Sequence, residues 1–266
     1  MKQIEDIVRQ IVDLNKDSVI QDIKHCKTLD DIEVLWKIIK DKNEIMDPYI
    51  LGYWLGDGDT NASKITTEDL EIVEYFKEYI NKLNLQFKKT DAIHYSITTC
   101  TKFGEKGCNG FANMLRKYKL LGDKHIPDNY KYNNKDIRLK VLAGLIDSDG
   151  HLEKNVYDFT LKCEKLVDDA IFLIRSLEFF TYKTKCKKTC TNSKNGPVTG
   201  DYFRFHICGE GLEDILVLLI RKKAHERMSP KDGCVKLLSI GKRECCGFEL
   251  DGNKRFLMED FTVTSV

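Results

Sequence analysis

Two short stretches of the sequence decide the fold: YILGYWLGDG at residues 49–58 and VLAGLIDSDG at residues 141–150. Each is an apolar run that contains small residues and ends in Asp-Gly, which predicts a buried helix able to pack closely against another. The terminal glycine predicts the left-handed stop that many helices use. One such run is typical of any buried helix, but two predict an internal repeat. The matching positions, at an offset of 92, are Gly52 with Gly144, Asp57 with Asp149, and Gly58 with Gly150.

The residues that follow the two stretches repeat as well. After each motif, hydrophobic spacing predicts two strands, a helix, two strands and a closing helix. The predicted helices cover 70–83, 111–121, 166–177 and 212–221, and the predicted strands include 65–67, 86–90, 94–100, 157–161, 181–187 and 202–208, with a loop at 192–200. The predicted fold class is α+β, with two pseudo-symmetric αββαββα repeats packed through their motif helices. The expected domains are a helical extension at 1–48, repeats at 49–138 and 139–230, and a C-terminal block at 231–266.

The composition excludes several classes of protein. The chain has 266 residues, 43 basic and 42 acidic, and is 42% hydrophobic, so it is neither disordered nor fibrous. No apolar run reaches the roughly 18 residues of a membrane span, and no signal peptide is expected. Ten irregularly spaced cysteines indicate reduced thiols in an intracellular protein rather than a disulfide framework.

The charge is unevenly distributed along the chain. Residues 1–48 hold eight basic and 11 acidic residues and predict a poor binder of polyanions. Residues 183–243 hold 14 basic and six acidic residues, a local excess that favours binding to a polyanion such as DNA or, equally, a solvated surface. The candidate DNA-binding residues are Lys183, Lys185, Lys187 and Lys188, with Arg204 and Lys222. Alternation along a strand places three of the first four on one face, where they either contact DNA or protect an edge strand.

The paired motifs predict a metal site. If the two motif helices pack side by side, Asp57 and Asp149 converge at their C-terminal ends, and two close carboxylates repel each other unless a cation lies beside them. Exposed carbonyls at the helix ends, at Gly56 and Ser148, are further candidate ligands. Hard oxygen ligands favour Mg²⁺, and a bound metal can generate hydroxide and stabilise the leaving oxygen in phosphodiester cleavage.

These motifs resemble the two signature helices of the LAGLIDADG homing endonucleases, and LAGLIDSDG at 142–150 departs from the family name by one residue. The resemblance covers roughly residues 49–230. It implies saddle-shaped sheets laid in the major groove of a long DNA site, a monomer, and one cut per strand that leaves 3′ overhangs. It also implies Mg²⁺ as cofactor, with Mn²⁺ as a substitute and Ca²⁺ able to bind without cleavage, and a nuclear location.

The resemblance further implies one basic residue beside each aspartate. In this sequence Lys124 stands three residues before a proline, and Arg227 stands three residues before another. The family favours lysine at both positions, so an arginine that cannot act as a base predicts slower cutting of one strand. Lys222 and Lys223, in the preceding turn, are the alternatives.

The last residues carry a second resemblance. Residues 246–264 look like the C-terminal splicing block of yeast vacuolar-ATPase-type inteins, a lineage that includes mating-type-switching endonucleases. The chain ends in Thr-Ser-Val instead of His-Asn and begins with Met-Lys-Gln-Ile, so splicing is expected to be lost.

Three other interpretations stay open. The first is a DNA-binding protein on the same fold that has lost cleavage, and the second is an RNA maturase, against which the intein-like tail argues. The third is a zinc site, because two strands that pair could bring together Cys186, Cys190, His206 and Cys208, although this spacing fits no common zinc motif.

Overall fold

The computed structural model describes residues 46–99, 109–190 and 198–226, together with short parts of the tail between 239 and 265. The chain divides into two units, Met1–Met46 and Asp47–Val266, and the second is described below. The helices predicted before residue 46 and most of the loop predicted at 192–200 lie outside the described residues, and the domain boundaries stay predictions.

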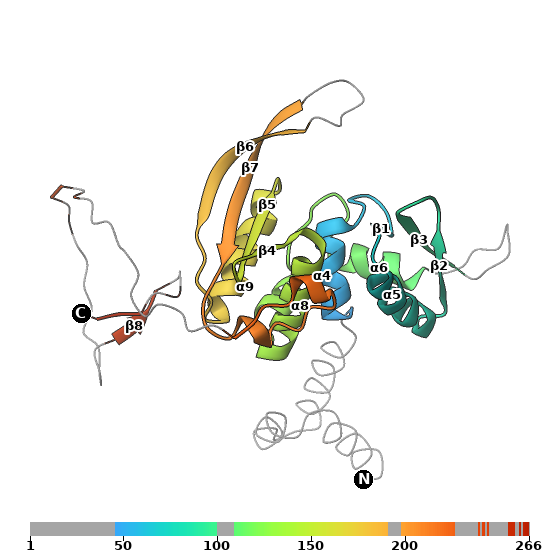
Figure 1. The fold of residues 1–266 in the computed structure, drawn as a ribbon, viewed down its shortest axis with the longest axis horizontal. Coiled ribbons are helices and arrows are strands. Elements are labelled where there is room, and N and C mark those ends of the chain that lie inside the picture. The colour runs from blue at the N-terminus through green and yellow to red at the C-terminus, as the bar shows by residue number, and fades with distance from the viewer. Residues whose placement is uncertain are drawn as a thin grey trace, which may run out of the picture. The chain divides into compact units, whose positions relative to one another are not determined.

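Two helices, α4 (Pro48–Asp57) and α8 (Lys135–Asp149), lie side by side at the centre of this unit (Figure 1). Both begin at a capped residue: the side chain of Asp47 accepts from the amide of Ile50, and that of Asn134 accepts from Ile137. Because α4 is buried from Tyr49 to Leu55, it is apolar all round rather than amphipathic.

The close approach of the two helices depends on a pair of glycines. A β-carbon built on Gly52 would lie 2.0 Å from the carbonyl oxygen of Val141, and one built on Gly144 would lie 2.1 Å from that of Tyr49. Both distances are far inside van der Waals contact, so any larger residue must force the backbones apart. This confirms the expectation that small residues allow the motif helices to meet.

The glycines that end the helices act differently from the prediction. Gly58 and Gly150 are extended, with φ of −78° and −76°, and not left-handed. A β-carbon on Gly58 would lie 2.3 Å from the carbonyl oxygen of Trp54 and 2.5 Å from Cδ1 of its ring, and one on Gly150 would lie 2.8 Å from the carbonyl oxygen of Ile146 and 2.9 Å from Cζ of Phe159. Close contact with the last helical turn and with an aromatic ring, rather than a left-handed backbone, therefore requires glycine at both ends.

We expect Gly144→Ala to lower the free energy of unfolding by about 2–3 kcal/mol, because overpacking against a backbone carbonyl cannot be relieved by a rotamer change. Urea unfolding measures the change. Gly110→Ala is the matched control, since a β-carbon there meets nothing within 4 Å, and we expect equal or slightly higher stability. An equal effect of the two substitutions would contradict the close approach.

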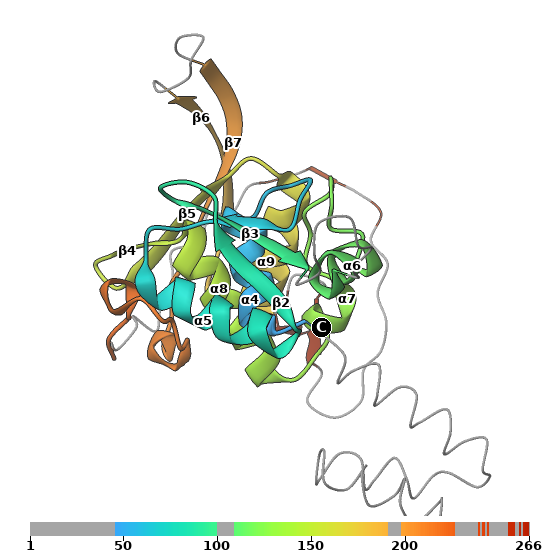
Figure 2. The same ribbon diagram turned by 90° about the vertical axis from the view of Figure 1, so that its right-hand side faces the viewer.

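The first half of the unit, residues 47–133, contains a three-stranded antiparallel sheet of order β1-β3-β2. Its strands are β1 (Lys64–Thr66), β2 (Leu85–Lys89) and β3 (His94–Thr99), and its other helices are α5 (Leu70–Lys82), α6 (Gly110–Lys117) and α7 (Asp128–Lys131). Phe76 of α5 stacks on Phe87 of β2, which in turn stacks on Tyr95 of β3, so α5 covers one face of the sheet (Figure 2). The other face presents polar side chains.

The second half, residues 134–226, contains a four-stranded antiparallel sheet of order β4-β5-β7-β6. Its elements are β4 (His151–Glu153), β5 (Val156–Leu161), α9 (Glu164–Ser176), β6 (Lys183–Cys190), β7 (Val198–Ile207) and the 3₁₀ turns η1 (Leu212–Asp214) and η2 (Ile220–Lys222). The buried rings of Phe159 and Phe205 stack on the face that α9 covers. The β6–β7 hairpin extends well beyond that helix (Figure 1).

The structure corrects two parts of the predicted repeat. Two strands are predicted between α4 and α5, but only β1 forms there. In place of the other strand there is a single β-bridge between Gly58 and Ile65. In the second half, the helix predicted at 212–221 is replaced by two 3₁₀ turns. The amides of Leu218 and Leu219 donate to the side chain of Asp147, so they are not available for an α-helical ladder.

The remaining described parts are small. The tail contributes β8 (Arg255–Leu257) paired with β9 (Val263–Ser265). No described helix has the length and apolar character of a membrane span.

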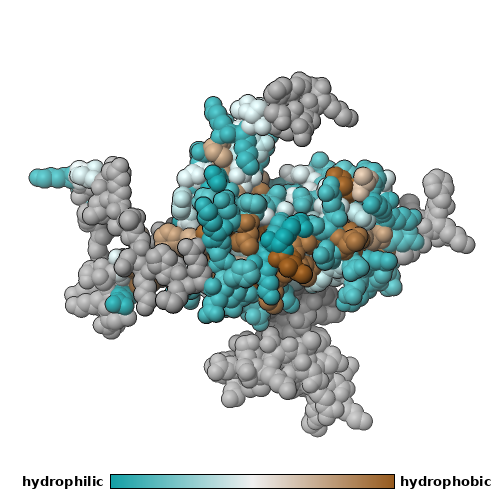
Figure 3. All heavy atoms as spheres, in the orientation of Figure 1, coloured by the Kyte–Doolittle hydropathy of each residue, from teal (hydrophilic) through white to brown (hydrophobic). Residues whose placement is uncertain are grey.

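Most of the described surface in Figure 3 is hydrophilic. Large apolar side chains are nevertheless exposed in this part of the chain, among them Leu70, Leu216 and Ile220, and the predicted burial of Leu70 is therefore wrong.

Candidate active site

Two carboxylates meet where α4 and α8 end. Asp57 is the last residue of α4 and Asp149 the last of α8. The helix ends are so close that a β-carbon on Gly56 would lie 2.7 Å from Oδ2 of Asp149 and 2.0 Å from Oγ of Ser148. The convergence predicted from the two motifs is therefore observed.

The electrostatics of this pair favour a cation. Burial raises the pKa of Asp57 to about 6, and the carboxylate of Asp149 adds to the rise. Desolvation also raises the pKa of Asp149, although this residue is exposed overall. Carboxylates that desolvation destabilises as anions gain most from a nearby positive charge.

Lys124 supplies one such charge at the end of α4. Its ammonium donates to the carbonyl oxygens of Gly56, at 3.0 Å, and Gly58, at 2.7 Å. It also lies 5.2 Å from the centre of the Trp54 ring, a cation–π contact. The lysine thus binds the negative end of the helix dipole, and burial lowers its pKa. Trp54 is buried, as the sequence predicts.

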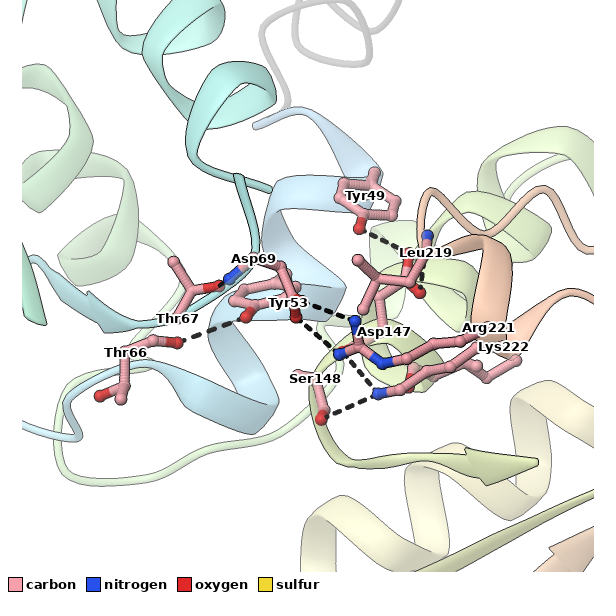
Figure 4. Close-up of polar contacts among 11 residues, drawn as sticks. Tyr49, Tyr53, Thr66, Thr67, Asp69, Asp147, Ser148, Leu219, Arg221 and Lys222 are labelled. Carbon is pink, nitrogen blue, oxygen red and sulfur yellow. Dashed lines mark hydrogen bonds and ion pairs between the residues drawn. The ribbon is translucent and has the colours of Figure 1, made fainter. Parts of the chain in front are cut away.

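Lys222 has the same arrangement at the end of α8. Its ammonium donates to the carbonyls of Asp147, at 2.7 Å, Ile146, at 2.9 Å, and Ser148, at 3.3 Å (Figure 4). Burial lowers its pKa also. The neighbouring Lys223 is exposed, and Arg227 lies outside the described residues. Lys222 is therefore the described residue that matches the placement of Lys124.

Both lysines lower the pKa of both motif aspartates, but their order differs between the two. Among the charges that lower the pKa of Asp57, Lys222 exceeds Lys124, and among those that lower the pKa of Asp149, Lys124 exceeds Lys222. We call the pairs Asp57 with Lys222 and Asp149 with Lys124 the composite sites. Each combines an aspartate from one half of the fold with a lysine from the other.

A further buried carboxylate, which the sequence analysis missed, holds the chain that carries Lys222. Asp147 is 2% exposed and accepts from the hydroxyl of Tyr49 at 2.7 Å and from the amides of Leu218 at 2.7 Å and Leu219 at 3.4 Å. Those hydrogen bonds fix the turn that leads into η2. An acid inside an otherwise apolar motif is the signal that could have revealed it, since a buried charge requires partners.

A cavity of about 300 Å³ opens beside the composite site of Asp57 and Lys222. Asp69 and Arg221 line it together with Tyr53 (Figure 4). Polar groups from both halves therefore surround one space next to the paired carboxylates.

The sheet of the second half has two chemically distinct faces. Strand register places Lys183 and Lys185 opposite Phe205 and Phe203, so they share the face that α9 covers. Lys183 donates to Asp168 at 2.5 Å and Glu164 at 3.0 Å on that helix. The alternation of Lys183, Lys185 and Lys187 on one face is as predicted, but that face is turned toward α9.

The opposite face of the same sheet is polar and open. Arg204 forms a bidentate pair with Asp158, with both distances 2.9 Å, and His206 lies 3.1 Å from the same carboxylate. Lys188 belongs to this face by register, and it is among the charges that lower the pKa of Asp149. The free face of the hairpin thus presents basic groups on the side of the paired carboxylates.

The structure does not assemble the suggested zinc site. Cys190 pairs with Val198 at the far end of the hairpin, whereas Cys208 pairs with Phe180 at the near end. Ten residues of strand separate the two pairs, about 33 Å at the usual rise. One ion cannot bind both, and the described residues contain no cluster of three or more metal-binding side chains of His, Cys, Asp or Glu.

We expect the metal-free protein to be less stable than its Asp57→Asn variant at pH 8, by about 1–3 kcal/mol, with the gap closing as the pH falls toward 4. The folded pKa of about 6 lies above the unfolded value, so the anion costs the folded state free energy above pH 6. As the pH falls through 6, the folded carboxyl takes up a proton first and the cost disappears. Urea unfolding in EDTA measures the gap. The exposed Asp201→Asn should show none, and equal stability at pH 8 would contradict the burial penalty.

Comparisons with known proteins give similarities of limited extent. No family model matches the sequence. A replicative DNA helicase DnaB of Mycobacterium intracellulare is 28% identical over 142 residues, 53% of this chain, and the chain spans about a fifth (20%) of that protein. The crystal structure of I-DmoI in complex with DNA and Ca has 15% sequence identity and a TM-score of 0.39, covering 61% of this chain and 82% of that one. Mesophilic variants of the homing endonuclease I-DmoI give the same values, and I-DmoI with DNA and Mn gives a TM-score of 0.37 over 88% of its chain. The chain is a mixed α+β protein with antiparallel sheets, and it is similar to these structures at low identity.

Proposed function

We propose that this chain is a metal-dependent DNA endonuclease of the LAGLIDADG type that cuts each strand of a specific duplex site once. The observation that carries the proposal is the pair of composite sites, in which the half-buried Asp57 and the more exposed Asp149 converge and each lies near a lysine from the other half. The pseudo-symmetry of the sites suits a duplex, whose two strands are themselves related by two-fold symmetry.

The donor set fits a hard divalent cation. Asp57 and Asp149 would hold it, and carboxylate oxygens of this kind favour Mg²⁺ and Mn²⁺. The carbonyls of Gly56 and Ser148, the other ligands predicted from the sequence, accept from Lys124 and Lys222 instead. The raised pKa of Asp57 supports this, since a cation would offset the burial and the charge of Asp149 that raise it. When bound, such an ion supplies a more acidic water and stabilises the leaving oxygen of a phosphodiester.

The lysines supply the proton chemistry and the positive charge. Burial lowers the pKa of both Lys124 and Lys222, so each releases a proton more easily than an exposed lysine does. Each ammonium is held against helix carbonyls, so its position beside the reacting phosphate is fixed before the substrate binds. Charged, the same group stabilises the negative charge that develops on the phosphate oxygens. We assign the second basic position to Lys222 rather than to Arg227 or Lys223.

The duplex would lie across the free faces of the two sheets. In the second half we assign DNA contacts to Lys188 and Arg204, because they share the uncovered face. Lys183 is assigned to anchoring the hairpin on α9, and the exposed Lys185 and Lys187 stay candidates for phosphate contacts. The bidentate pair with Asp158 fixes the plane of the Arg204 guanidinium, which is the group that most often reads guanine.

Selection of cleaved sites from a randomised or genomic DNA library tests the proposal. With Mg²⁺ or Mn²⁺ the chain should yield one family of long sites cut on both strands, with 3′ overhangs. Specific DNA binding without any cut would select the alternative of a binding protein that has lost cleavage, and tighter binding to RNA than to DNA would select a maturase. Gel filtration of the complex should show one chain per duplex.

A further inference from the structure

The residue before each site lysine forms an ion pair with the start of the long helix in the other half. Arg221, before Lys222, binds the carboxylate of Asp69 at the start of α5 with two bonds of 2.6 and 2.7 Å (Figure 4). Asp123, before Lys124, binds Lys165 in the first turn of α9 at 2.5 Å. The two contacts stand in matching places in the two halves, but their charges are reversed.

The N-cap residues of α5 and α9 also contact the opposite half of the fold instead of capping their own helices. Asp69 is the N-cap of α5, and aspartate normally accepts hydrogen bonds from its own helix there, yet its side chain makes no capping bond. Cys163 is the N-cap of α9 and makes none either. Its thiol lies 3.4 Å from the carbonyl oxygen of Lys124 and donates to it. Both caps thus bind the other half's lysine segment instead of their own helix.

We propose that Asp69–Arg221 and Asp123–Lys165 are positioning latches, each of which holds a site lysine of one half against the aspartate of the other. The inference rests on the proposed nuclease function, and it assigns each latch to the cutting of a single DNA strand. Arg221, Asp69, Asp123 and Lys165 are positioning residues, since they act through the neighbouring lysine.

The latches are poorly suited to a purely stabilising role. The side chains of Arg221 and Asp69 are 60% and 22% exposed, and those of Lys165 and Asp123 are 53% and 54% exposed. Exposed ion pairs contribute little to stability because solvent screens them and ordering long side chains costs entropy. A small displacement of a catalytic group, in contrast, lowers the rate strongly, so the same contact has a larger effect on cleavage than on folding.

The two latches should differ in importance. The segment with Lys124 is also held from the second half by Asp169, whose carboxylate accepts from the amide of Ile126 at 2.9 Å. The segment with Lys222 is held within its own half, because Asp147 accepts from Leu218 and Leu219 and the hydroxyl of Tyr157 donates to the carbonyl of Lys222 at 2.8 Å. Its hydrogen-bonded contact with the first half is the bidentate Asp69–Arg221 pair. Loss of the Asp69–Arg221 latch should therefore slow its strand more than loss of the Asp123–Lys165 latch slows the other.

The first experiment measures each strand separately on a plasmid that carries a selected site. Arg221→Gln should act on the same strand as Lys222→Met. It should slow cutting of that strand by about fivefold to tenfold and leave cutting of the other strand within about twofold of the normal rate. The loss should appear in kcat and not in KM, and Arg221→Lys should restore most of the rate. The matched control is Arg116→Gln, since Arg116 is an exposed arginine that bonds only locally to Asn113 in the described hydrogen bonds of α6.

The second experiment uses the reversed polarity. Lys165→Glu should slow the strand assigned to Lys124 by about threefold, although an acidic residue in the first turn of α9 favours the helix dipole and does not unfold it. Asp123→Lys in the same chain restores an ion pair with the polarity that the other latch uses, and should recover at least half of the lost rate. A double variant slower than Lys165→Glu would overturn the proposal.

Hydrogen exchange distinguishes failure of the latch from failure of the proposed function. Without DNA, the amides of residues 220–222 should exchange several-fold faster in Arg221→Gln than in Arg116→Gln. Unchanged exchange, or equal slowing of both strands, overturns the latch. A wild-type chain that cuts no selected DNA overturns the nuclease function itself, and the catalytic role of the latch with it.

Discussion

Asp57→Asn should lower the rate of double-strand cleavage roughly a thousandfold, and Asp149→Asn should do the same. The amide that replaces either carboxylate is a weaker ligand and carries no charge. Because the two carboxylates converge at one seam, each contributes to the surroundings of the other, and neither variant should retain normal cutting of even one strand. Conversion of supercoiled plasmid to linear product in Mg²⁺ measures the loss.

Binding separates this loss from misfolding. In EDTA, Asp57→Asn should bind the selected duplex at least as tightly as wild type, since removal of a buried anion reduces repulsion of phosphate. The exposed Asp201→Asn is the control and should cut normally. Normal cleavage by either motif variant would contradict the proposed site.

Lys222→Met should slow one strand about a hundredfold and leave the other nearly unchanged, so that nicked circles accumulate. Lys124→Met should slow the opposite strand by a similar factor. The reason is that each ammonium is held at a different helix end, Lys124 on α4 and Lys222 on α8, and each belongs to a different composite site. Strand-specific end labelling measures both rates.

The rival assignment provides the control for that result. Lys223 follows Lys222 in the chain but is exposed, so Lys223→Met should leave both strands at normal rates. A hundredfold loss in Lys223→Met, or an equal loss on both strands in Lys222→Met, would contradict the composite sites.

The motif helices, their glycines and the convergence of Asp57 and Asp149 could be predicted because they depend on local pattern and on one repeated spacing. The counterpart of Lys124 could not be singled out, because proline spacing favours Arg227 and the preceding turn offers Lys222 and Lys223. In the structure Asp147 binds two amides of that segment and the predicted helix does not form. Lys222 is then the described residue placed like Lys124, whereas Arg227 lies outside the described residues.

Contacts between distant residues were equally invisible in the pattern. Asp69 before an apolar helix reads as an ordinary N-cap, and nothing local indicates that its carboxylate binds Arg221, 152 residues further along the chain. The alternating lysines of β6 were placed on one face correctly, but which face α9 covers depends on Phe203 and Phe205 in the neighbouring strand.

The composite sites limit how such a chain can diverge. A half transferred from a homologue would bring its own aspartate. That aspartate would have to work with the lysine of the original half, whose position was set by a different partner. Gene conversion or shuffling at the boundary between the halves would therefore succeed only between parents whose lysine segments are interchangeable. The two halves must drift together, as co-inherited partners rather than independent modules.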